Sequence, residues 1–106
     1  MDGISLLVFS LVLFAVAWAA ILLRRNLLVM SMGIQWLFVA VAVSFVGFAR
    51  LHAAGGEEQA AVRGESAAIF VLVLASIHLA TGLAVVFAQA RTRESSNVDD
   101  ASDLRW

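Results

Sequence analysis

The charged residues of this chain leave three long gaps, and these gaps constrain the fold more than any other feature. Asp, Glu, Lys and Arg are absent from residues 3–23, 26–49 and 66–90. At 1.5 Å rise per residue, a helix of about 20 residues crosses a hydrocarbon core of about 30 Å. The segments lack the alternating polarity of membrane β-strands. We therefore predict an all-α membrane protein whose three transmembrane helices span about residues 4–23, 27–49 and 67–90.

The composition favours lipid as the surrounding solvent. Of the 106 residues, 62% are hydrophobic and 14% are charged, whereas soluble domains average about 45–50% and about 25%. So short a chain has too much surface to hide this apolar content in a core. It has no cysteine, which excludes disulfides and thiolate metal sites. The net charge of −1 gives no reason to expect a nucleic acid as a partner.

The arginines predict how the chain is oriented in the membrane. The basic turn Arg24–Arg25 and the segment 91–93 contribute four arginines on one side, whereas Arg50 and Arg63 lie on the other side among glutamates. The positive-inside rule therefore places the N-terminus outside and the C-terminus in the cytoplasm. A signal peptide is not expected, because the first apolar segment follows Asp2 and precedes the basic turn.

The remaining segments are polar. Residues 51–65 read LHAAGGEEQAAVRGE, and the Gly-Gly pair predicts a loop in which His52 is solvated. Residues 91–106 are rich in Ser and Asp, as is typical of flexible or partner-bound ends. We expect a transmembrane domain over residues 1–90 and a polar cytoplasmic tail over 91–106.

His78 is the one side chain in the three apolar segments that titrates near neutral pH. An ionisable residue at this depth normally faces the bundle interior or a hydrated cavity, and is a candidate functional residue. The alternative is a neutral imidazole bonded to a neighbouring helix. The face of His78 is small or polar, which allows another helix to approach closely. The residues of that face are Ala75, Thr81, Gly82, Val85 and Gln89, and those opposite, better suited to lipid, are Phe70, Leu72, Ile77 and Leu79.

Gln35 is similarly placed in the second apolar segment. Ser31, Val39 and Ala42 share its helical face, and Gly33 is near. A buried glutamine must satisfy one acceptor and two donors, or cost about 1–3 kcal/mol. It is either an interhelical hydrogen-bonding group or the occupant of a position built for a proton carrier. No phosphate-binding loop, metal cluster or nucleophile–base pair is present, so we expect no catalytic residue and no cofactor or metal site in this chain.

Two stretches carry a family resemblance. LLRRNLLVMSMGIQWLFVAVAV (22–43) and AIFVLVLASIHLATGLAVVFA (68–88) resemble two helices of the K subunit of respiratory complex I, called 4L in mitochondria. The likeness covers residues 6–90 and leaves out the tail. It implies a small membrane-arm subunit of a proton-pumping NADH–quinone oxidoreductase, beside antiporter-like subunits in a prokaryotic inner membrane. NADH, FMN, iron–sulfur clusters and quinone would be bound by partner subunits.

The chain departs from the family at two positions. The family's buried glutamates, which form part of a hydrated charge relay, align with Gln35 and His78, and the loop at 51–65 is longer than usual. Glutamine cannot titrate, and protonated histidine is positive. Either His78 exchanges protons with Gln35 as its hydrogen-bonding or water-positioning partner, or the subunit only scaffolds its neighbours. Two other interpretations stay open: the C subunit of a multisubunit cation/proton antiporter, and a generic assembly or lipid-organising protein.

Overall fold

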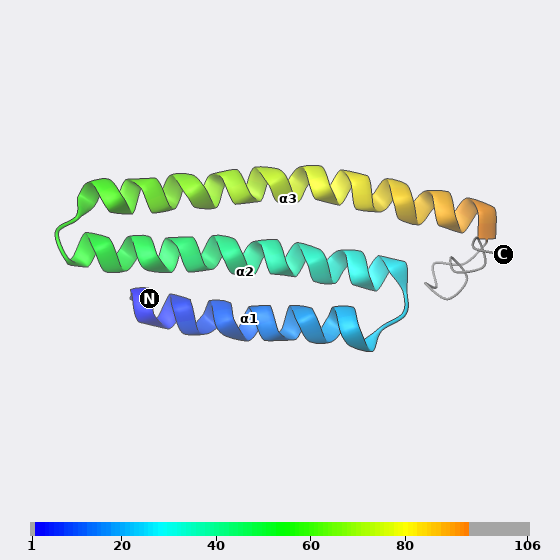
Figure 1. Cartoon of the computed structure of the whole chain (residues 1–106), viewed down its shortest axis with the longest axis horizontal. Coiled ribbons are helices and arrows are strands. Elements are labelled where there is room, and N and C mark those ends of the chain that lie inside the picture. The colour runs from blue at the N-terminus through cyan, green and yellow to red at the C-terminus, as the bar shows by residue number, and fades with distance from the viewer. Residues whose placement is uncertain (1, 94–106) are drawn as a thin grey trace.

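Three α-helices make up the computed structural model, which describes residues 2–93 (Figure 1). They are α1 (Gly3–Leu23), α2 (Leu27–Ala54) and α3 (Glu58–Arg93), and the described residues contain no strand. All three are long and apolar enough to cross a membrane. The predicted all-α fold with three membrane helices is confirmed, whereas the side on which each terminus lies stays a prediction.

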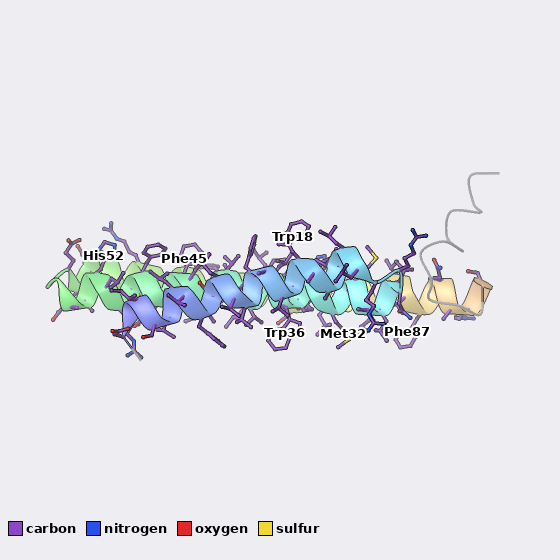
Figure 2. The ribbon with its side chains drawn as sticks, turned by 90° about the horizontal axis from the view of Figure 1, so that it is seen from below. Trp18, Met32, Trp36, Phe45, His52 and Phe87 are labelled. Atoms are coloured by element: carbon purple, nitrogen blue, oxygen red, sulfur yellow. The ribbon has the colours of Figure 1, made fainter. Side chains whose placement is uncertain are left out.

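The helices form one flat antiparallel layer with α2 in the middle (Figure 1). α2 packs against both α1 and α3, so the described residues leave the two broad faces of the layer uncovered. Seen edge-on, Trp18 and Phe45 project from one face, and Met32 and Trp36 project from the other (Figure 2). Trp18 is 42% exposed and Trp36 is 50% exposed. Both faces therefore offer large apolar side chains to lipid or to neighbouring subunits.

Small residues form the helix interfaces. The buried residues are mostly alanine, together with Ser10 and Ser31, and no large side chain of the described chain is fully buried. A Cβ added to Gly3 would lie 2.6 Å from the carbonyl oxygen of Gly47, and one added to Gly64 would lie 3.0 Å from Cβ of Ala49. Such close backbone approach lets membrane helices gain dispersion energy where lipid removes the hydrophobic driving force.

Polar side chains cap the starts of α1 and α2. The Asp2 carboxylate accepts a 2.8 Å hydrogen bond from the backbone N–H of Ser5, and the Asn26 side chain accepts one of 2.9 Å from Leu28. Each satisfies a donor that has no partner within its helix. Arg24 ends α1 because its backbone is extended, with φ −116° and ψ 141°.

The loop predicted over residues 51–65 is wrong. α2 continues to Ala54 and α3 begins at Glu58, so the connection is only residues 55–57. His52 lies in the last turn of α2, exposed, with Nδ1 3.3 Å from a carboxylate oxygen of Glu57. Charged residues limit a membrane span but do not end a helix, because helical backbone is equally satisfied in water.

The other end of α3 also extends beyond its predicted span. The helix continues to Arg93, so the first three residues assigned to the polar tail are helical. Residues 94–106 of that tail lie outside the described residues. The apolar segment of α3 therefore has a polar helical extension at each end. This is expected for a helix that is longer than the hydrocarbon core.

Candidate functional site

His78 and Gln35 meet at the interface of α2 and α3. The Gln35 amide nitrogen, Nε2, lies 3.4 Å from Nδ1 of His78, and both residues are half-buried. Ser31, one turn before Gln35, and Ala75, one turn before His78, are buried in the same interface. The two residues singled out by their polarity therefore share one site, although they are 43 positions apart in the chain.

The contact suits more than one protonation state of the imidazole. An amide nitrogen only donates, so in the observed arrangement Nδ1 of His78 accepts, and the ring proton of the neutral form sits on Nε2. A half-turn of the amide would present its oxygen instead, which accepts a hydrogen bond from a protonated Nδ1. Gln35 can thus partner both the neutral ring and the imidazolium without a change in backbone.

An aromatic ring covers part of the imidazole. The Phe38 ring centroid lies 5.4 Å from that of His78, with the rings tilted by 52°. Phe38 follows Gln35 by three positions, so one face of α2 supplies both contacts. These two residues hold the Nδ1 side of the imidazole against α2.

A groove between α2 and α3 opens beside His78. Its volume is about 240 Å³. Elsewhere in the described residues, too, no buried side-chain nitrogen or oxygen lacks a partner. Within residues 2–93 no hydrogen bond reaches Nε2 of His78. Because no buried side-chain nitrogen there lacks a partner, this nitrogen is accessible at the surface of the chain. The groove is lined by His78 with Leu27, Met30, Ser31, Ile34, Thr81, Gly82, Val85 and Val86.

Four of the five residues predicted to pack helices lie at interfaces within the chain. Ser31 and Ala75 are buried between α2 and α3, and a Cβ on Gly82 would lie 2.5 Å from Oγ of Ser31. Gly33 faces α1 instead, where a Cβ would lie 2.7 Å from Cγ1 of Ile21.

Thr81, the fifth of these residues, is exposed. Its hydroxyl donates a 3.1 Å hydrogen bond to the carbonyl oxygen of Ile77 in its own helix. It lines the groove beside His78. A packing role for Thr81 against a neighbouring subunit stays a prediction.

The basic turn connects α1 and α2. Arg24 and Arg25 are both exposed in the turn between α1 and α2. Among the described residues, no group of three His, Cys, Asp or Glu side chains is placed to hold a metal ion. Arg24 and Arg25 lie at one end of the layer, because they connect α1 to α2. There they can meet lipid headgroups or a neighbouring subunit.

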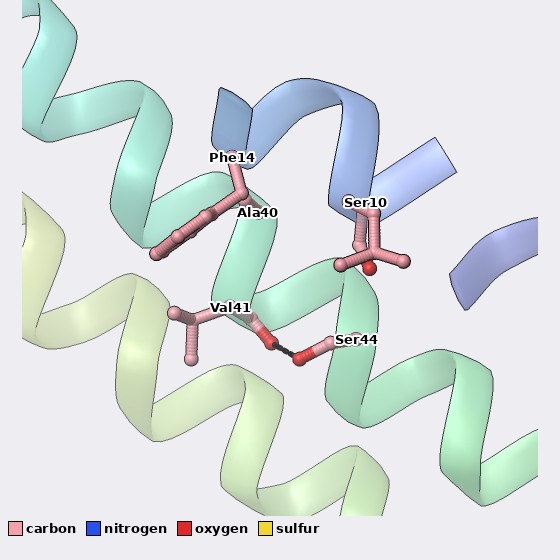
Figure 3. A pocket seen from close by; sticks show the side chains of 6 residues that line it. Ser10, Phe14, Ala40, Val41 and Ser44 are labelled. Atoms are coloured by element: carbon pink, nitrogen blue, oxygen red, sulfur yellow. Dashed lines mark hydrogen bonds between the residues drawn. The ribbon is translucent and has the colours of Figure 1, made fainter. Parts of the chain in front are cut away.

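A second hollow, between α1 and α2, was not anticipated from the sequence. Ser10, Phe14, Ala40, Val41 and Ser44 surround it (Figure 3), and its volume is about 260 Å³. Both hydroxyls bond within their own helices, Ser10 to the carbonyl of Leu7 at 2.7 Å and Ser44 to that of Val41 at 2.6 Å. Because the hydroxyls of Ser10 and Ser44 are bonded within their own helices, we interpret this hollow as a packing feature.

One family model matches the chain. The family is described as NADH-ubiquinone/plastoquinone oxidoreductase chain 4L, and the match covers residues 5–106. The chain belongs to this family. It is a K-type small membrane subunit of NADH–quinone oxidoreductase and a multi-pass membrane protein whose partners are other subunits of the complex I membrane arm. The match is longer than the resemblance at residues 6–90 and includes the tail. The alternative antiporter and lipid-organising interpretations gain nothing from it.

Proposed function

We propose that His78 is the proton-exchange group of this 4L-type subunit and that Gln35 is its hydrogen-bonding partner. The observation that supports this is the 3.4 Å contact between Gln35 and His78. It joins the two positions at which the family resemblance expects glutamates. The pair lies on facing helices within the apolar segments, in which His78 is the one ionisable side chain.

The charge carried by this site differs from that of a carboxylate site. A glutamate alternates between neutral and negative, whereas histidine alternates between neutral and positive. A neighbouring positive charge favours loss of the proton from either residue. That loss leaves a negative carboxylate at a glutamate site but a neutral imidazole at His78. In this proposal His78 takes up a proton when its surroundings become more negative and releases it when they become more positive.

We also propose how the subunit sits in its assembly. The arginine distribution favours an N-terminus outside and a C-terminus in the cytoplasm of a prokaryotic inner membrane. The exposed apolar faces of the layer suit antiporter-like neighbours. In this arrangement NADH, FMN, iron–sulfur clusters and quinone are bound by partner subunits, and this chain contributes to the intramembrane proton path.

The proton-to-electron ratio of the assembled complex tests the proposal. His78→Ala and His78→Gln remove the titrating group, so both are expected to lower the ratio while NADH oxidation continues. His52→Ala is the matched control, because His52 is exposed at the end of α2. An unchanged ratio in both His78 variants would instead assign the subunit a scaffolding role.

A further inference from the structure

One broad face of the layer carries a wholly apolar hollow over α2. Its volume is about 330 Å³. Every side chain that lines it is apolar, so it offers no hydrogen bond and disfavours a polar occupant. Phe14 of α1 and Val71 of α3 form its two walls, and its floor is Ile34, Leu37, Phe38 and Val41 of α2.

An aromatic pair leads from this hollow toward the basic turn. The rings of Phe14 and Trp18 meet edge-on, with centroids 6.2 Å apart and planes at 73°. Trp18 projects from the same face of the layer as Phe45, which lies one turn after Val41 on α2 (Figure 2). Trp18 precedes Arg24 by six positions, or about 9 Å along the helix. Apolar surface therefore runs from the hollow almost to the arginines.

The end of the layer that holds the basic turn carries only positive charge among the described residues. Arg24 and Arg25 are exposed there, and so is Arg91. α3 reaches this end because Leu27 and Val86 line a common groove, which puts Arg91 about 8 Å further along α3. The described acidic residues lie toward the opposite end of the layer, and they are Asp2, Glu57, Glu58 and Glu65.

We propose that this face binds an anionic phospholipid. Its phosphate lies among Arg24, Arg25 and Arg91, and one acyl chain follows the aromatic pair into the hollow. Basic clusters beside membrane helices attract anionic headgroups. A single lipid molecule matches both features of this face, because it joins an anion at the membrane surface to an apolar chain below it. The proposal is independent of proton exchange at His78.

The depth of the hollow agrees with the length of an acyl chain. Ile34, the first lining residue of α2, follows Arg25 by nine positions, or about 14 Å along the helix. One leaflet takes up half of a hydrocarbon core of about 30 Å, which is about 15 Å. An acyl chain whose headgroup is held at the arginines therefore ends in the hollow.

Photolabelling of the complex in lipid vesicles tests the proposal. The probe is phosphatidylglycerol with a diazirine near the end of one acyl chain, added at low fraction to phosphatidylcholine. Irradiation is expected to label peptides of this chain that contain Phe14 or Val41, as read by mass spectrometry. Phosphatidylcholine with the same diazirine chain is expected to label them much less. Equal labelling by the two lipids, or no labelling of these peptides by either, would overturn the proposal.

Charge variants locate the headgroup. Arg24→Gln and Arg91→Gln are each expected to lower labelling by phosphatidylglycerol about fivefold, the effect of one arginine near an anionic membrane surface. Arg50→Gln and Arg63→Gln are the matched controls, because they make the same charge change at exposed positions toward the other end of the layer. Equal losses in the two pairs of variants would contradict a headgroup site at the basic turn.

Two further measurements apply if the arginine variants do not assemble. In the wild-type complex, excess unlabelled phosphatidylglycerol is expected to suppress the labelling, and excess phosphatidylcholine is not. Val41→Phe is expected to reduce the labelling of the Phe14 peptide by filling the hollow, whereas Val73→Phe, at a position that is 52% exposed on α3, is not. Failure of phosphatidylglycerol to compete, or equal effects of the two phenylalanine variants, would overturn the proposal.

Discussion

The amide nitrogen of Gln35 lies 3.4 Å from Nδ1 of His78, across the interface between α2 and α3. Because an amide can donate through its nitrogen or accept through its oxygen, this contact supports the ring in both of its protonation states. A carboxylate at position 35 would favour only the charged form. The neutral amide therefore adds no charge of its own to the site.

Gln35→Leu is expected to loosen the α2–α3 interface only modestly. Interhelical hydrogen bonds in membranes contribute roughly 0.6 kcal/mol on average and about 1.7 at most, because the separated helices also find partners. Thermal dissociation of the subunit from the complex should begin at a slightly lower temperature, and the proton-to-electron ratio should fall. Gln59→Leu, which changes an exposed amide at the start of α3, should affect neither. Identical behaviour of the two variants would argue against a working Gln35–His78 contact.

Gly82→Ala should destabilise the same interface through one atom. The added Cβ would lie 2.5 Å from Oγ of Ser31 but 3.7 Å from its Cβ. Overpacking costs about 1–3 kcal/mol, and rotation of the hydroxyl should keep this case near the lower end. Ser31→Ala removes the clashing oxygen, so the double variant should recover the loss. A double-mutant cycle on unfolding in detergent measures the coupling, and strictly additive effects would show that the two residues do not oppose each other.

The two glycines of the α2–α3 turn should respond to alanine with opposite signs. Gly56 has φ +85° and open space around its Cα, so Gly56→Ala should lose about 1–2 kcal/mol through backbone strain alone. Gly55 has φ −83°, so Gly55→Ala should be neutral or stabilise by about 0.4–1 kcal/mol through the unfolded state. Chemical unfolding in detergent micelles compares them, and equal losses would mean that the turn has another geometry.

Acid should release the N-terminal cap of α1. The hydrogen bond from the backbone N–H of Ser5 lowers the pKa of Asp2 below its usual 3.8. A lowered pKa in the folded state means that the carboxylate's contribution is complete above about pH 3.8 and is lost as the pH falls through the folded-state value. Hydrogen exchange at the Ser5 amide should therefore accelerate in that acidic range. Asp2→Asn should keep the cap without this pH dependence, and an unchanged exchange profile in wild type would contradict the cap.

The number and type of helices could be predicted from the sequence because lipid imposes a minimum length on each charge-free segment. The buried face of α3 could also be predicted in part. Ala75 and Gly82 lie toward α2, whereas Phe70 and Ile77 are exposed on the opposite side. Small residues at helical spacing identify a packing face even without a view of the partner helix.

The register of α2 against α3 could not be predicted, because the connection was expected to be a loop over residues 51–65. A connection of residues 55–57 fixes the two helices side by side and brings Gln35 opposite His78. Gly33 is two positions from Gln35 in the sequence, but it faces α1. A residue on the central helix can contact either flanking helix, and its neighbours in the sequence do not show which one.

Proton exchange at His78 can be measured directly, as protonation of its imidazole during turnover. Infrared difference spectra of the assembled complex with isotope-labelled histidine, taken between its oxidised and reduced states, report conversion of imidazole to imidazolium. We expect such a band in wild type and in His52→Gln, and its loss in His78→Gln. A wild-type spectrum with no band that depends on His78 would contradict proton exchange at this residue.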